Sequence, residues 1–213
     1  MKIKTTIATY FKKTKRILTN LVLLFILTFG AAACQSNQTS QLEINQLNAL
    51  NGTYIDPIPY EYGQGVYGKR EFTFKNGSWT LDFVLALDPK LNTKVFRFRT
   101  LGSYEILRPS ANLPQAYEAN FKEDKKFVTL LTQDKGLAQA FGLMSCSLAI
   151  GIEKDISKEG CSLWKSVKDC PIDHDLVKLD KDGKLYFGVR PKDNNMCKEE
   201  FRPTSLTPPT IRM

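Results

Sequence analysis

Two alternating segments joined by an Asn-Gly dipeptide constrain the fold of this chain more than any other feature. Residues 71–75 (EFTFK) and residues 78–87 (SWTLDFVLAL) flank Asn76-Gly77. Both turn residues tolerate the positive φ that a type I′ turn requires, which makes this dipeptide the strongest short hairpin signal. The sequence therefore predicts an antiparallel β-hairpin over residues 71–87.

The two-residue turn sets the register of the predicted hairpin, with Phe74 opposite Trp79 and Phe72 opposite Leu81. Alternation in residues 94–100 (KVFRFRT) places two more phenylalanines on one side of the next strand. One face of the sheet is therefore rich in large apolar side chains, which are candidates to bind a ligand. They are Phe72, Phe74, Trp79, Leu81, Phe83, Phe96 and Phe98. The alternative is that these side chains simply fill the core.

The rest of the chain has short strand patterns, frequent turn signals and little helix pattern. Further strands are expected at residues 102–107, 116–121, 127–132, 149–156, 175–179 and 184–189. We expect one short helix over residues 134–143 and an extended, proline-rich tail over residues 201–213. Short strands separated by turns favour an all-β barrel or a strongly curved antiparallel sheet.

The N-terminus has the layout of an export signal. A basic segment without acidic residues precedes the apolar run 21–29 (LVLLFILTF), and three alanines follow before Cys34. The apolar run is short for a membrane span, and the whole pattern is typical of a secretory signal. A cysteine directly after small residues resembles the lipobox of bacterial lipoproteins, in which the thiol receives acyl groups such as palmitate.

This N-terminal pattern leaves one alternative open. A lipobox usually has Leu where Ala31 stands, and Ala31-Ala32-Ala33 also suits an ordinary signal peptidase, which would leave a free Cys34. We favour lipidation. The expected organisation is a lipoprotein signal peptide at residues 1–33, a lipidated cysteine with a polar tether at residues 34–44, and a folded domain at residues 45–213.

The basic excess of the chain belongs mainly to the predicted signal. The whole chain has 30 basic and 22 acidic residues, a net charge of +8, and six of the basic residues fall in residues 1–33. Without that segment the net charge is +2, so we expect no nucleic-acid partner. The remaining 180 residues are enough for one domain with a hydrophobic core.

The four cysteines outside the signal form an even set, which leaves Cys34 unpaired. Their spacing contains no C-x-x-C knuckle typical of zinc sites, and exported proteins favour disulfides over such sites. We therefore expect two disulfides and no metal. The four residues are Cys146, Cys161, Cys170 and Cys197.

His174, the only histidine, lies between Asp173 and Asp175 in the segment PIDHDLV. At the start of a strand the two aspartates would point away from the histidine. We therefore expect a solvated loop histidine and not a general base or metal ligand. The sequence predicts no catalytic residue and no cofactor, and we expect that the protein is not an enzyme.

Several stretches together resemble a known domain family. They are C-SLAIGIEKDISKEG-C from Cys146 to Cys161, DHDLVKLDKDGKLYFGVRP, FRPTSL, LNGTY and GKREFTFKNGSWTLDFVLALD. In order and spacing they resemble the domain of the adenomatosis-polyposis-coli down-regulated protein, a membrane-anchored Wnt inhibitor of vertebrates. The likeness covers roughly residues 50–207 of the chain.

This resemblance implies a lipocalin-like curved sheet or half-barrel with a hydrophobic cavity that takes a lipid group. The pairing in the family implies a Cys146–Cys161 disulfide, and Cys170 and Cys197 are then expected to pair with each other. The chain departs from the family in having one domain where the animal proteins have two. It also lacks the cysteines that the animal domains carry in the loops at residues 59–63 and 88–93.

The sequence thus favours a lipid-anchored protein of the bacterial outer membrane that binds a lipid or another hydrophobic ligand. Gln35 supports this location, because signals that retain lipoproteins at the inner membrane usually place Asp after the lipidated cysteine. The alternative is a surface module that contacts an envelope protein or glycan without a cavity. Its contact patch for an anionic partner would consist of Lys69, Arg70, Arg97 and Arg99.

Overall fold

The structure is a computed structural model that describes residues 38–213, so the predicted signal peptide and Cys34 lie outside the described residues. Residues 44–213 form one compact unit, and residues 38–43 belong to a separate N-terminal unit. In the described range, no helix is both long enough and apolar enough to span a membrane.

A helix occupies residues 38–48, and its first seven residues belong to the segment predicted as a polar tether, residues 34–44. Within the compact unit, the reason lies in apolar spacing. Ile44 and Leu47 are three residues apart, which places them on the same helix face. Leu47 is buried in the core and Ile44 packs against it. Tertiary packing of this face stabilises a segment that is otherwise polar.

The compact unit is mostly β-structure. Its strands are β1 (Gly52–Ile55), β2 (Tyr60–Gly63), β3 (Val66–Lys75), β4 (Ser78–Ala86), β5 (Lys94–Pro109), β6 (Tyr117–Lys122), β7 (Lys125–Leu130), β8 (Glu153–Asp155), β9 (Ile172–Leu179), β10 (Leu185–Phe187) and β11 (Ile211–Arg212). The helical elements are α2 (Lys135–Ala140) and the 3₁₀ turns η1 (Leu143–Cys146) and η2 (Glu199–Phe201). The short helix predicted at residues 134–143 is confirmed as α2, with Asp134 as its N-cap.

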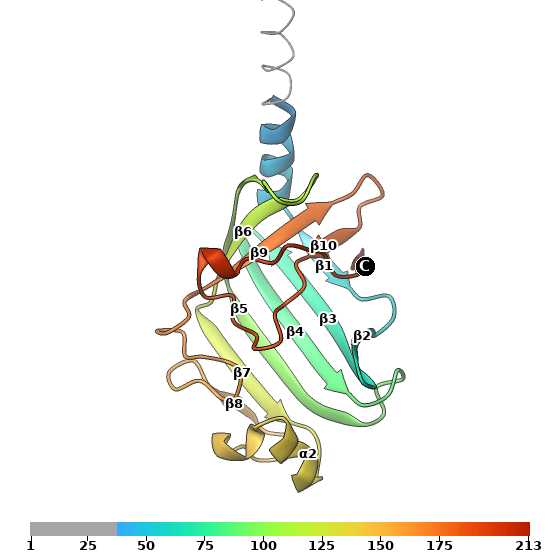
Figure 1. Ribbon diagram of the computed structural model, residues 1–213, viewed down its shortest axis with the longest axis vertical. Coiled ribbons are helices and arrows are strands. Elements are labelled where there is room, and N and C mark those ends of the chain that lie inside the picture. The colour runs from blue at the N-terminus through green and yellow to red at the C-terminus, as the bar shows by residue number, and fades with distance from the viewer. Residues whose placement is uncertain (1–37) are drawn as a thin grey trace, which may run out of the picture. The chain divides into compact units, whose positions relative to one another are not determined.

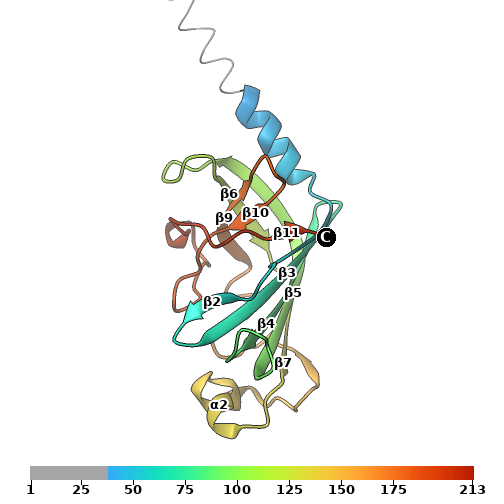
Figure 2. The same ribbon diagram turned by 90° about the vertical axis from the view of Figure 1, so that its right-hand side faces the viewer.

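The strands form one antiparallel sheet in the order β10-β9-β6-β5-β4-β3-β1-β11, with β2 beside β3, and β7 between β5 and β8. Figures 1 and 2 show that this sheet is strongly curved. The ends nearly meet, because Leu185 of β10 bridges Thr210, directly before β11. The predicted all-β fold, a strongly curved antiparallel sheet or barrel, is thereby confirmed.

The predicted hairpin is present with the predicted register. Phe74 pairs with Trp79 and Phe72 pairs with Leu81 between β3 and β4. Asn76 and Gly77 have φ values of 51° and 76°, the positive angles that a type I′ turn needs.

Strand β5 is longer than predicted. The sequence suggested separate strands at residues 94–100 and 102–107, whereas β5 is one strand of 16 residues. Its first half lies between β4 and β7, and its second half pairs with β6. Gly102 marks the change of partner, because the backbone of Lys122 crosses so closely there that a Cβ at Gly102 would lie 1.9 Å from the Lys122 carbonyl oxygen.

Two other predictions near the C-terminus need correction. The strand expected at residues 149–156 is limited to β8, because Ile150 forms only an isolated bridge to Leu130 and a turn follows at Gly151. His174 lies in a strand and not in a loop, since pairing with β6 extends β9 back to Ile172. The expected alternation still holds, because Asp173 and Asp175 are buried while His174 is only partly buried.

Two disulfides are present, Cys146–Cys161 and Cys170–Cys197, as the predicted pairing requires. They close loops of 15 and 27 residues. On the chain-entropy account, each contributes about 3–4 kcal/mol to stability by restricting the unfolded chain.

Candidate functional site

The inner side of the curved sheet contains a cavity of about 510 Å³. This volume lies within the range of roughly 300–1,000 Å³ that is typical of small-molecule sites. Side chains from β3, β4 and β5 form one wall of the cavity. The opposite side is formed by residues 162–164 and by the segment that follows β10, residues 188–194.

Most of the predicted apolar face lines this cavity. The lining includes Phe72, Trp79, Leu81, Phe83, Phe96 and Phe98. Phe74 does not belong to the lining and is a core residue. It is 1% exposed, and its ring packs edge-on against Tyr54 and Tyr104 at centroid distances of 6.0 and 5.0 Å. The face is therefore divided between filled core and open cavity.

The aromatic residues opposite this wall, above all Trp164, were not predicted from the sequence. Its ring stacks on Phe98 at a centroid distance of 4.8 Å and meets Phe96 edge-on at 5.0 Å. Trp164 lies just after the Cys146–Cys161 loop, and it is held by reciprocal backbone hydrogen bonds with Cys161 of 2.7 and 2.9 Å. No alternating pattern surrounds Trp164, so only its residue type could have indicated from the sequence that it belongs to the site.

Arg70 is a cavity residue, which corrects its place in the predicted outward patch. Arg70 shares a face of β3 with Phe72, since strand side chains alternate. It is 5% exposed and forms a bidentate pair with Asp56, with Nη2–Oδ1 and Nε–Oδ2 distances of 2.6 and 3.0 Å. Its Nη1 donates a 2.6 Å hydrogen bond to the Thr207 hydroxyl. The guanidinium is thus fully engaged by protein groups.

The other predicted patch arginines point outward, and both are paired. Arg97 forms an ion pair with Asp82 on the neighbouring strand β4. Arg99 forms an ion pair with Glu153 at 2.6 Å and also lies over the Phe127 ring, 4.1 Å from its centroid. These pairs neutralise much of the positive charge that a contact patch for an anionic partner would need.

The cavity also has a polar end, which the sequence analysis did not assign to a site. Asp173 and Asp175 of β9 both belong to its lining, as does Arg190. Arg190 pairs with Asp173 at 2.7 Å through Nη2 and donates a 2.6 Å hydrogen bond to Asn194 through Nε. Burial opposes the charge of Arg190, but Asp173 and Asp175 outweigh it and raise the pKa of the guanidinium.

His174 takes no part in this cavity. Its Nδ1 lies 3.3 Å from Nη2 of Arg202, on the side of β9 opposite to the aspartates. Burial, and next the positive charge of Arg202, lower the pKa of His174. The three residues of the DHD sequence therefore do not converge, in agreement with the sequence analysis.

A buried ion pair lies behind the polar end. Glu123 and Lys126 are 3% exposed each and form an ion pair, and Lys126 also donates hydrogen bonds to the carbonyls of Lys165 and Cys170. Burial raises the pKa of Glu123 to about 7, and the charge of Asp173 acts in the same direction. A small void beside this pair is lined by Trp164 and by two residues of the polar end, Asp173 and Arg190.

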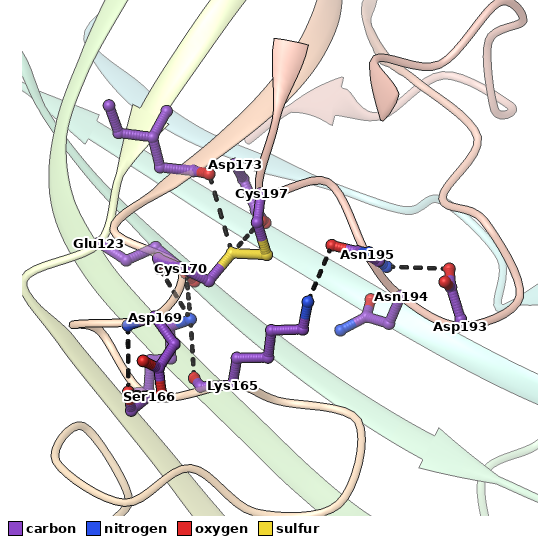
Figure 3. Close-up of a disulfide and its surroundings, with 12 residues drawn as sticks. Glu123, Lys165, Ser166, Asp169, Cys170, Asp173, Asp193, Asn194, Asn195 and Cys197 are labelled. Carbon is purple, nitrogen blue, oxygen red and sulfur yellow. Dashed lines mark hydrogen bonds and ion pairs between the residues drawn. A yellow bond between two sulfur atoms is a disulfide. The ribbon is translucent and has the colours of Figure 1, made fainter. Parts of the chain in front are cut away.

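The Cys170–Cys197 disulfide anchors the segment that carries Arg190 and Asn194. Figure 3 shows the disulfide beside Glu123 and Asp173, with Lys165 hydrogen-bonded to Asn195 at 3.2 Å. Glu123, Cys170 and Asp173 are close enough together to suggest a metal site. The Cys170 sulfur is bonded to Cys197, however, so it is not a thiolate ligand, and the cluster does not resemble a protein metal centre.

No protein-family model matches the chain, and no curated protein matches it.

Proposed function

We propose that this chain is a non-enzymatic protein of the bacterial outer envelope that binds a lipid or another hydrophobic ligand in the aromatic cavity. The observation that carries the proposal is the cavity itself, about 510 Å³ in size and walled mainly by aromatic and aliphatic side chains. Protein interiors are normally close-packed, so an apolar space of this size is typical of a binding site and not of a core. The resemblance to the Wnt-inhibitor domain supports the same function.

The fit of an alkyl chain to this cavity follows from simple transfer energies. Each methylene that moves from water to an apolar environment contributes about 0.8 kcal/mol. Phe83 and Leu81 on one wall and Leu163 on the other offer that environment. A ten-carbon chain would therefore gain several kcal/mol before the costs of immobilisation.

Tryptophan fluorescence provides a direct test. The chain has two tryptophans, and Trp79 and Trp164 both line the cavity. We expect decanol, an uncharged chain, to change the fluorescence of the purified, delipidated protein in a saturable way. Phe83→Glu should weaken this binding at least about ten-fold, because it places a charge in the apolar wall.

The matched control is Val84→Glu, on the same strand. Val84 lies opposite Lys69 and Arg97 in the sheet register and is not part of the cavity lining. This variant should bind decanol as the unmodified protein does. No saturable fluorescence change, or equal weakening by both substitutions, would contradict the proposal.

The membrane anchor is a separate part of the proposed function. We expect intact-mass spectrometry of the protein from native membranes to find Cys34 as the N-terminal residue, carrying a diacylglyceryl group. Cys34→Ser should abolish this modification and move the protein from the membrane fraction to the soluble fraction. A mature N-terminus elsewhere with an unmodified thiol at Cys34 would instead indicate ordinary secretion.

A further inference from the structure

Asp175 is a buried carboxyl group that lines the cavity without a cationic partner. It is 6% exposed, and its Oδ1 accepts backbone hydrogen bonds from Leu176 at 2.7 Å and from Gly188 at 2.9 Å. Its Oδ2 accepts no hydrogen bond from residues 38–213, and no ion pair in that range includes Asp175. The other two carboxylates of the cavity region, Asp56 and Asp173, each pair with an arginine.

The cationic groups around Asp175 already interact with other protein groups. Arg190 is held by Asp173 and Asn194, and Arg70 is held by Asp56. On the outer side of β9, Arg202 donates to the Asp175 backbone carbonyl at 2.6 Å. Its Nε lies 3.8 Å from the carboxylate of Glu118.

The remaining nearby charges do not supply a partner either. Glu123 and Lys126 neutralise each other, and Lys192 is exposed where it lines the cavity. In and around the cavity two arginines, of which Arg190 is only partly buried, face three aspartates, with Asp56 counted as the partner of Arg70 behind the lining. When all five groups are ionised, one negative charge is left. A net charge in an apolar cavity is unfavourable unless a counter-ion joins it.

The cost of this charge acts on the pKa of Asp175. Burial raises its pKa to about 6, even though Arg190 and the two backbone N–H groups act in the opposite direction. At neutral pH the carboxyl group of Asp175 is thus ionised, but its ionised form is less stable in the cavity than in water. A cation beside Oδ2 would relieve this penalty.

On these grounds we propose that the hydrophobic ligand carries a protonated amine or another organic cation, which pairs with Asp175 while its apolar part lies along the aromatic wall. This inference rests on the proposed function, because it assigns the polar end of the same ligand. The aromatic faces of the cavity suit such a ligand as well, since cations are attracted to ring faces within about 6 Å. Phe121 and Phe187 join Asp175 in the cavity lining.

The experiment compares three ligands with the same chain, namely decylamine, decanol and decanoate, by tryptophan fluorescence at about pH 7.5, where an alkylamine is protonated and Asp175 is ionised. We expect decylamine to bind at least about ten-fold more tightly than decanol, as a buried charge pair should. Decanoate should bind more weakly than decanol. Tighter binding of decanoate than of decylamine would overturn the inference.

The matched variant is Asp175→Asn, which keeps an oxygen able to accept the hydrogen bonds from Leu176 and Gly188. It should abolish the preference for decylamine over decanol, because the variant has no charge to pair with the amine. An unchanged preference would also overturn the inference.

A measurement on the unmodified protein covers the case in which this variant does not fold. Lowering the pH from about 7.5 to about 5 protonates Asp175, so the preference for decylamine over decanol should fall. A preference that is constant over this range would overturn the inference.

Binding of decanol without any preference for decylamine would support the proposed function and contradict only the inference that the ligand has a cationic head group. If none of the three ligands binds, both the proposed function and this inference are contradicted.

Discussion

Replacement of Asp56 by alanine should lower the free energy of unfolding by about 3–5 kcal/mol, the cost of removing one partner from a buried ion pair. The substitution leaves the Arg70 guanidinium in the interior without its counter-ion. In the intact protein this pair has side chains that are 7% and 2% exposed for Arg70 and Asp56. The remaining hydrogen bonds of Arg70, to Thr207 and to the Pro208 carbonyl, do not neutralise its charge. Urea denaturation followed by circular dichroism measures the loss.

The matched control is Asp82→Ala, which removes the partner of Arg97. The Arg97 side chain is 44% exposed, so water screens the uncompensated charge and the loss should be no more than about 1 kcal/mol. A double substitution, Asp56→Leu with Arg70→Met, should recover much of the stability, because an apolar pair avoids the desolvation of both charges. Similar losses for Asp56→Ala and Asp82→Ala would show that burial does not decide the cost.

Gly102→Ala should lower the free energy of unfolding by about 3 kcal/mol, the upper end of the cost of overpacking. The added Cβ would lie 1.9 Å from the Lys122 carbonyl oxygen, and a backbone atom in a sheet cannot move aside as a flexible side chain can. The same oxygen accepts a 3.0 Å hydrogen bond from Nε1 of Trp79, which any displacement would disturb. A lowered midpoint in urea, together with altered tryptophan fluorescence, would report both effects.

Gly65→Ala serves as the control for this substitution. Gly65 has a φ of 74°, so a side chain is strained there, but no atom lies within 4 Å of the added Cβ. The cost should therefore be limited to about 1–2 kcal/mol of backbone strain. A Gly102→Ala variant as stable as the unmodified protein would contradict the close approach of β5 to the end of β6.

Local rules were enough to predict the centre of the sheet. The positive φ of Asn76 and Gly77 determines the turn, the turn determines the register, and the two-residue period places Phe72 and Trp79 on the inner face. The same period places Arg70 inside, although the alternative contact patch included it together with its sequence neighbour Lys69. That error arose because the partner, Asp56, lies 14 residues away and has no pattern that links it to Arg70.

The sequence by itself thus determined the central hairpin, the two faces of its strands and the type of each side chain available to the site. Tertiary structure alone decided which of these side chains meet a partner. Phe74 packs against Tyr104 and Phe98 packs against Trp164, whereas Phe83 is only partly buried where it lines the cavity. Alternation describes neighbours within a strand, but a cavity depends on the distance between segments far apart in the chain. The physical reason is that close packing, and any failure of it, belongs to the assembled fold.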